Sequence, residues 1–191
     1  MEAVEIEGKA IVTKDDFSKL LHFFKKDEKD AIIQHNYYFE TDDFTLKRHE
    51  LALRIRAREE TYTLTLKQPA DDGILETNQI LTKKEFERAI FNQKLPEGVI
   101  TAKLRDLNVP LETIQCAGKM TTRRIEFSYE QGTICLDQSE YFDYVDYEIE
   151  FEGTSRAHVE KTLRDLFSKL KITPLDADNK ISRFFKRKMK R

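Results

Sequence analysis

Residues 51–67 read LALRIRAREETYTLTLK, and this stretch contains two alternating runs separated by a short polar spacer. The first run alternates apolar residues with Arg54, Arg56 and Arg58, and the second alternates Tyr62, Leu64 and Leu66 with Thr63, Thr65 and Lys67. A period of two predicts strands with one apolar and one polar face. The spacer 59–61 predicts a hairpin, and therefore an antiparallel pair.

The same pattern recurs along most of the chain. Strands are expected at residues 4–12, 34–40, 51–58, 62–67, 74–81, 112–129, 133–137 and 143–152. Helices are expected at residues 13–24, after the capping box that begins at Thr82, at 155–171 and at 180–191, with helix and loop at 96–108. Hairpins with helices inserted between them predict an α+β fold with an antiparallel sheet, in one domain covering residues 1–191.

Composition excludes several classes of function. Lys and Arg number 33 against 35 Asp and Glu, and this balance opposes general nucleic-acid binding. No apolar run is long enough to cross a membrane, and the N-terminus has no signal peptide, so no membrane partner is expected. Cys116 and Cys135 stand apart from any metal-binding cluster, which predicts reduced thiols in a cytoplasmic protein.

The polar faces of the strands are sorted by charge. Arg54, Arg56 and Lys67 come from one group of strands, whereas Glu148, Glu150 and Glu152 come from another. Like charges at every second position lie only about 6.5–7 Å apart and repel one another unless a counter-charge offsets them. Two interpretations remain open: an antiparallel sheet with a solvated face, or a sheet closed around a charged interior that binds an anionic, metal-loaded ligand.

A set of short motifs resembles one known family in the correct order. Glu5-Ile6-Glu7-Gly8-Lys9 is similar to the ExExK signature of the CYTH superfamily, the triphosphate tunnel metalloenzymes. The remaining matches are Gln34–Thr41, Leu53-Arg54-Ile55-Arg56, Leu66-Lys67, Leu136-Asp137 and Glu148-Ile149-Glu150. The resemblance extends from residue 5 to about residue 184 and is greatest to bacterial members labelled adenylate cyclases.

The resemblance implies a fold, a cofactor and roles for individual residues. The fold would be an eight-stranded antiparallel β-barrel, a tunnel with helices packed outside, and the cofactor would be Mg²⁺ or Mn²⁺. Metal ligands would be Glu5, Glu7, Glu148 and Glu150. Phosphate ligands would be Lys9, Arg54, Arg56, Lys67 and Arg123. Glu5, Glu7, Lys9 and Asp137 would form the catalytic set.

Two positions have more than one interpretation. Arg123 is preferred by resemblance, but alternation places Arg124 opposite the apolar Ile125 and Phe127, so Arg124 competes for the inward position. The basic C-terminal helix is interpreted either as a solvated helix end or as a segment whose Lys180 and Arg183 close over phosphate.

The expected reaction is hydrolysis of a small-molecule triphosphate or polyphosphate, either inorganic tripolyphosphate or a nucleoside triphosphate. Cationic side chains would orient the phosphates and carboxylates would hold the metal. The alternatives are a class IV adenylate cyclase and a non-catalytic triphosphate sensor. For all three we expect one shared cavity, lined by Glu5, Glu7, Arg54, Arg56, Lys67, Glu148 and Glu150.

Overall fold

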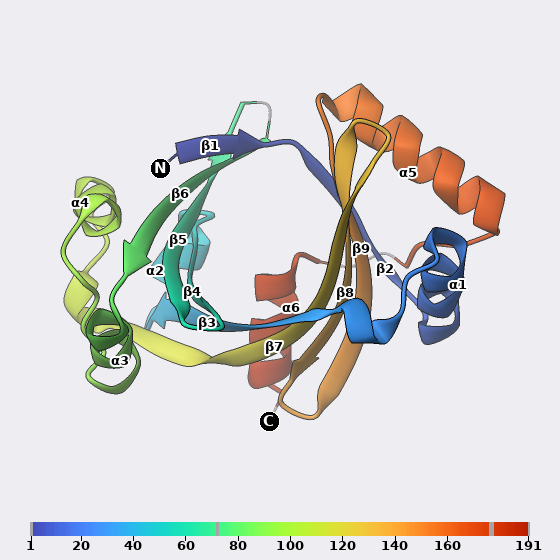
Figure 1. Ribbon diagram of the computed structural model, residues 1–191. Coiled ribbons are helices and arrows are strands. Elements are labelled where there is room, and N and C mark those ends of the chain that lie inside the picture. The colour runs from blue at the N-terminus through green and yellow to red at the C-terminus, as the bar shows by residue number, and fades with distance from the viewer. Residues whose placement is uncertain (1, 72, 176–177, 191) are drawn as a thin grey trace. The chain divides into compact units, whose positions relative to one another are not determined.

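The computed structural model describes residues 2–71, 73–175 and 178–190, and these residues form nine strands (Figure 1). The strands are β1 (Glu2–Glu5), β2 (Glu7–Val12), β3 (Ile32–Thr41), β4 (Ala52–Arg58), β5 (Thr61–Ala70), β6 (Gly73–Leu81), β7 (Ile114–Tyr129), β8 (Gly132–Tyr141) and β9 (Tyr144–Glu152). The α-helices are α1 (Lys14–Phe24), α2 (Thr45–Arg48), α3 (Lys83–Phe91), α4 (Val99–Asp106), α5 (Arg156–Leu170) and α6 (Lys180–Lys188). Short 3₁₀ turns lie at Glu28–Asp30 and Leu111–Thr113.

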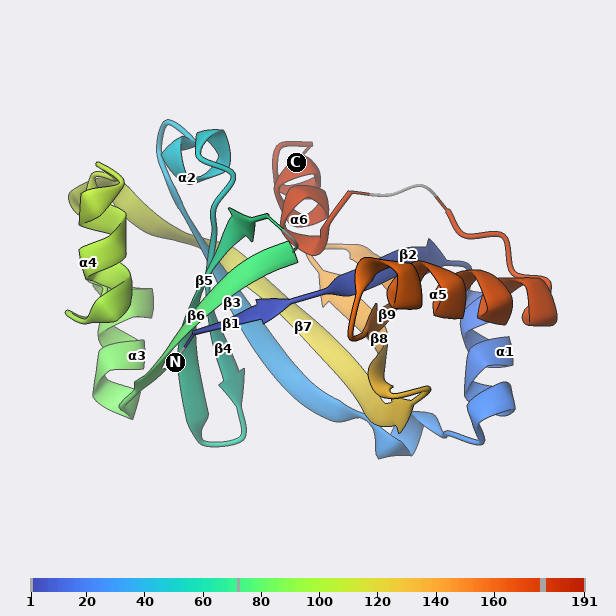
Figure 2. The same cartoon turned by 90° about the horizontal axis from the view of Figure 1, so that it is seen from above.

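The chain divides into two compact units, and the first consists of Met1–Glu5 and Gln34–Met120. Its antiparallel strands follow the order β1-β6-β5-β4-β3. Helices α3 and α4 contact β5 and β6 and cover the apolar face of these strands (Figure 2). Leu53, Ile55, Leu64 and Leu66 are fully buried beneath them. The alternate residues of the same strands therefore form a separate polar face.

The second unit consists of Ile6–Ile33 and Thr121–Arg191, and its strands follow the order β7-β8-β9-β2. Helices α1 and α5 lie on one face of these strands (Figure 1). On this face Leu136, Ile149 and Phe151 are fully buried. Helix α5 lies so close to β2 that a Cβ on Gly8 would lie 2.5 Å from Val159 Cγ1. Helix α6 contacts the opposite face, through side chains that bond to acidic residues of β8 and β9.

Local sequence signals locate the helix starts. The Thr13 hydroxyl accepts a hydrogen bond from the amide of Asp16, and Ser155 caps α5 in the same way. Thr82 and Glu85 form the expected capping box of α3. The expected C-terminal helix is confirmed as far as Lys188, and Arg191 lies outside the described residues.

One expected strand is wrong in its detail. Residues 4–12 were expected to form one strand, but the pairing changes partner at Ile6: Glu5 pairs across from Ile74, whereas Glu7 pairs across from Glu152. The break gives nine strands where the resemblance implied eight. It also places Glu5 and Glu7, both from the ExExK motif, in different compact units. The single-domain organisation stays a prediction.

Helices and cysteines add two observations. No helix among the described residues is both long and apolar enough to cross a membrane. Cys116 and Cys135 both carry free thiols.

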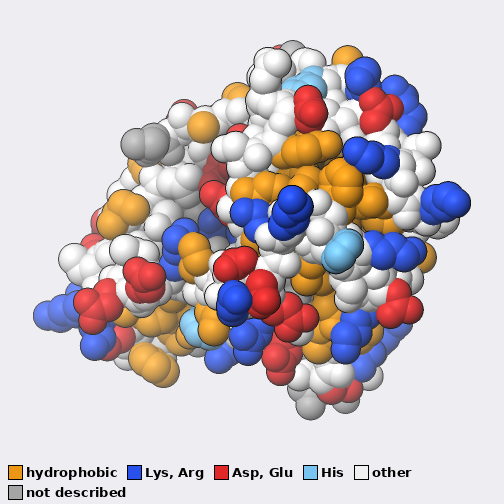
Figure 3. Space-filling model, turned by 45° about the vertical axis from the view of Figure 1, so that its right-hand side comes forward, with side chains coloured by type: hydrophobic (Ala, Val, Ile, Leu, Met, Phe, Trp, Pro, Cys, Tyr) orange, Lys and Arg blue, Asp and Glu red, His pale blue; other side chains and the backbone are white. Residues whose placement is uncertain are grey.

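Lys and Arg side chains lie among Asp and Glu side chains on the face shown in Figure 3.

Candidate functional site

The polar face of the first unit holds the cations that the sequence singled out. Arg54 and Arg56 project from β4 and Lys67 projects from β5, because apolar residues occupy the alternate positions of both strands. Lys67 Nζ lies 2.8 Å from Glu5 Oε2 and 2.8 Å from Glu76 Oε2. The structure therefore places Glu5, an expected metal ligand, beside Lys67, an expected phosphate ligand.

Glu76 belongs to this face but was not singled out from the sequence. Burial acts to raise its pKa, but the charges of Lys67 and Arg54 outweigh burial and lower the pKa to about 2. The carboxylate thus stays ionised and holds Lys67 in place. Glu76 is the only charged residue of β6, so strand alternation gave only a weak signal for it.

Arg54 has an unsatisfied donor. Its Nε atom is buried and has no hydrogen-bond partner among the described residues. Its nearest ion-pair partner is Glu76, 3.9 Å away from Nη2. A buried, unpaired guanidinium donor is costly, and an anionic ligand would satisfy it. The Arg54 guanidinium is therefore suited to donate a hydrogen bond to a phosphate oxygen.

The polar face of the second unit is dominated by carboxylates. Cross-strand register sets Asp137 of β8 opposite Glu148 of β9, and Arg124 of β7 opposite Asp137. Asp137 and Glu148 are almost completely buried, with 0% and 1% exposed. Directly opposed residues share a face of the sheet, so these charges are forced together.

Arg124, rather than Arg123, faces these carboxylates. Its Nε and Nη2 atoms donate to the two oxygens of Asp137 at 2.8 and 2.6 Å, and Nη2 also donates to Glu150. Arg123 is exposed. The preference for Arg123 is therefore wrong about which arginine faces inward, and the alternation of Arg124 with Ile125 and Phe127 carried the correct signal.

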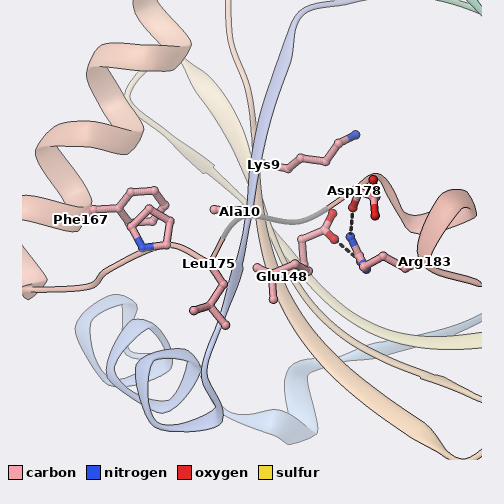
Figure 4. A pocket seen from close by; sticks show the side chains of 9 residues that line it. Lys9, Ala10, Glu148, Phe167, Leu175, Asp178 and Arg183 are labelled. Atoms are coloured by element: carbon pink, nitrogen blue, oxygen red, sulfur yellow. Dashed lines mark hydrogen bonds and ion pairs between the residues drawn. The ribbon is translucent and has the colours of Figure 1, made fainter. Parts of the chain in front are cut away.

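Helix α6 supplies two more cations to the same face. Lys180 Nζ lies 2.5 Å from Asp137, 3.1 Å from Glu148 and 2.5 Å from Glu150. Arg183 donates to Glu148 (Figure 4). Through Nε it also donates to Asp146 at 2.9 Å. The interpretation of α6 as a merely solvated helix end is therefore wrong for these two side chains.

Asp146 is a second residue that the sequence analysis missed. It is buried, and its Oδ2 atom accepts hydrogen bonds from Tyr141 and Arg183. It has the same strand phase as Glu148 and Glu150, so the signal was present in the alternation. Burial and the bond to Asp146 raise the pKa of the Tyr141 hydroxyl above its usual range.

Two glutamates of β9, Glu148 and Glu150, differ in their titration. Burial raises the pKa of Glu148 to about 7, and the neighbouring charge of Glu150 adds to the rise. Burial acts in the same direction on Glu150, but Lys180 and Arg124 outweigh it and hold its pKa well below the usual range. The two carboxylates lie close enough to titrate as a coupled pair rather than independently.

Lys9 and Glu7 lie on β2 beside these groups. Lys9 Nζ contacts Glu7 Oε1 at 2.7 Å. Lys9 also lines a pocket of about 370 Å³, together with Glu148, Arg183 and the apolar side chains of Phe167 and Leu175 (Figure 4). In Figure 4, Phe167 lies on the other side of β2 from Arg183.

The donor chemistry fits a hard divalent cation, because the clustered side chains offer carboxylate oxygens. The oxygens of Asp137, Glu148 and Glu150 already converge on one positive charge, the Lys180 ammonium. As these side chains lie, no three Asp, Glu, His or Cys residues of the described chain form a group that could hold a metal.

The fold and the site together define an α+β protein whose antiparallel strands bury charges of both signs on their polar faces. The chain belongs to the CYTH domain family, whose model matches residues 3–185. Membership of this family implies dependence on a divalent metal.

Relatives of known sequence and structure agree with this assignment. A Bacillus subtilis (strain 168) protein named "Putative triphosphatase YjbK" is 39% identical over 189 residues, covering 99% of this chain and 98% of the relative. A Bacillus halodurans crystal structure described as a "putative adenylate cyclase" is 45% identical, with a TM-score of 0.92 over 96% of this chain and 98% of its own. The expected α+β fold with an antiparallel sheet is confirmed.

A more distant structure shares the fold alone. HpAC1 from Hippeastrum is 21% identical, with a TM-score of 0.78 over 95% of each chain. The fold of the family therefore persists where four residues in five differ.

Proposed function

We propose that this protein hydrolyses a triphosphate, with inorganic tripolyphosphate or a nucleoside triphosphate as substrate and Mg²⁺ or Mn²⁺ as cofactor. The observation that carries the proposal is the buried, unpaired Nε of Arg54 on a face that also presents Arg56 and Lys67. Such a face binds a compact polyanion better than a neutral ligand. The name of the Bacillus subtilis relative supports the same reaction.

Each charged group has a proposed role in this reaction. The cations would bind phosphate oxygens and offset the charge that develops on them during transfer. These cations are Lys9, Arg54, Arg56, Lys67, Lys180 and Arg183, and Arg124 replaces Arg123 as the arginine of β7. Glu5, Glu7, Glu148 and Glu150 would hold the metal, with Asp137 as a further acidic residue. A bound divalent metal would neutralise phosphate charge and lower the pKa of a coordinated water.

Burial distinguishes these charged groups from ordinary ion pairs on a protein surface. Side chains of Lys180, Arg183 and Glu148 are only 12%, 11% and 1% exposed. Buried charges of this kind interact strongly and are weakly screened by salt. The expectation that Glu5, Glu7, Arg54, Arg56, Lys67, Glu148 and Glu150 line one cavity stays a prediction.

A substrate panel tests the function directly. Tripolyphosphate, ATP and thiamine triphosphate are incubated with the protein and Mg²⁺ or Mn²⁺, and both orthophosphate and cyclic AMP are measured. Metal-dependent release of orthophosphate is the expected result. Cyclic AMP from ATP would instead assign a class IV adenylate cyclase, and binding without turnover would assign a triphosphate sensor.

Arg54→Ala tests the phosphate-binding face without metal. Losing a charge-assisted contact of about 1.5–3 kcal/mol should weaken tripolyphosphate binding about ten- to hundredfold. Because the ligand binds only the folded state, tripolyphosphate should raise the melting temperature of the parent more than that of the variant. Thermal melts in EDTA measure the difference.

The matched control is Arg88→Ala, which removes an exposed arginine from α3. Its melting temperature should respond to tripolyphosphate as the parent does. Equal shifts for Arg54→Ala and the parent would remove Arg54 from the proposed site.

A further inference from the structure

Lys180 occupies the point at which three acidic side chains of two strands converge. Its Nζ atom contacts Asp137 Oδ2 and Glu150 Oε1 at 2.5 Å and Glu148 Oε1 at 3.1 Å. The lysine side chain is only 12% exposed. These three contacts offset the desolvation of the buried ammonium.

The same three oxygens are the donors that a hard divalent cation prefers. An ammonium and a metal ion cannot both occupy one point between three carboxylates, so the two must compete. Metal binding at these carboxylates therefore requires that Lys180 leave them.

A triphosphate supplies the reason for Lys180 to leave. Phosphate oxygens are strong acceptors, and a lysine head is a compact charge on a flexible four-carbon stem that can exchange partners by rotating. Helix α6 itself can stay in place during this exchange, because Phe184 is fully buried and Arg187 bonds to Asp143 at 3.0 Å.

We propose that Lys180 is an exchangeable counter-ion that couples metal binding to triphosphate binding. Without ligand its ammonium neutralises Asp137, Glu148 and Glu150. When triphosphate arrives, Lys180 transfers to phosphate oxygens and the freed carboxylates take the metal. Each ligand thus raises the affinity for the other. This inference rests on the proposed function and specifies how its site is loaded.

The test compares Mn²⁺ affinity in the parent and in Lys180→Met, from the electron paramagnetic resonance signal of free Mn²⁺. Methionine keeps much of the side-chain volume but removes the competing charge. Without triphosphate, we expect Lys180→Met to bind Mn²⁺ at least about tenfold more tightly than the parent, because the metal no longer competes with the ammonium for the three carboxylates. An unchanged or weaker affinity would overturn the inference.

Lys186→Met is the matched control. Lys186 lies on the same helix, its side chain is 59% exposed, and its partner is Asp178 rather than the three carboxylates. Its Mn²⁺ affinity should equal that of the parent. A gain equal to that of Lys180→Met would indicate a general effect of net charge and would also overturn the inference.

A second measurement uses the parent protein, so it holds even if Lys180→Met fails to fold. Mn²⁺ affinity is titrated with and without a non-hydrolysable imidotriphosphate, and a protein-free titration corrects for chelation in solution. We expect the analogue to raise Mn²⁺ affinity about tenfold or more. Independent binding of the two ligands would overturn the coupling alone, whereas no binding of the analogue would overturn the proposed function as well.

Discussion

Glu5→Gln and Glu7→Gln should each lower metal-dependent triphosphate turnover at least about a hundredfold, while the protein stays folded. Each change removes a carboxylate charge with little change in volume. Each glutamate is proposed to hold a metal that stabilises transition-state charge. Loss of one such stabilising contribution typically costs about two to three orders of magnitude in rate. Initial rates of orthophosphate release with saturating Mg²⁺ or Mn²⁺ measure the loss, and thermal melts confirm folding.

The separate surroundings of the two glutamates make this experiment informative. Glu5 lies beside Lys67 and Glu7 lies beside Lys9, in different units of the chain. Two similar losses would show that both units serve the reaction. Glu160→Gln, an exposed change on α5, should leave the rate unchanged. Near-full activity in either test variant would exclude that glutamate from the metal ligands.

Asp137→Asn should destabilise the protein by about 3–5 kcal/mol. Asp137 is fully buried, and its oxygens bond to Arg124 and Lys180. Asparagine keeps the shape but removes the carboxylate charge that Arg124 and Lys180 share at this position, and breaking a buried pair in this way has that cost. Denaturant unfolding in EDTA, which keeps metal out of the measurement, gives the change in the free energy of unfolding.

Asp165→Asn is the control for this prediction. Asp165 pairs with Lys161 at 2.8 Å on α5, but its side chain is 57% exposed. An exposed pair of this kind contributes at most about 1 kcal/mol. If both variants lost the same small amount, the carboxylate cluster of the second unit would not contribute to stability, and its charges would be as weakly coupled as surface pairs.

Strand alternation predicted much of the fold, because the period of two is a local property. Leu53 and Ile55 face the core while Arg54 and Arg56 face away from it, as the sequence indicated. The capping box at Thr82 likewise placed the start of α3, since a cap bonds to amides two or three residues away. The motif order pointed to the family, which the whole-chain matches show.

Other features depended on which strands pair. The change of partner at Ile6 has no local signal in the sequence. It arises because the strand segment before Ile6 pairs with β6, whereas the segment after it pairs with β9. Register also brought Arg124 against Asp137 and Glu150. Sequence spacing is silent about such contacts, since the residues lie 13 and 26 positions apart.

The sequence by itself thus determined the polar and apolar faces of the strands and the residue types that could bind metal and phosphate. Only the tertiary structure decided the partner of each charge. Helix α6 shows why: its basic spacing fits a solvated helix end equally well, but Phe184 anchors it on the face where Lys180 meets three carboxylates. Alternation is set by neighbours in the chain, whereas buried charges are paired by segments that meet only after folding.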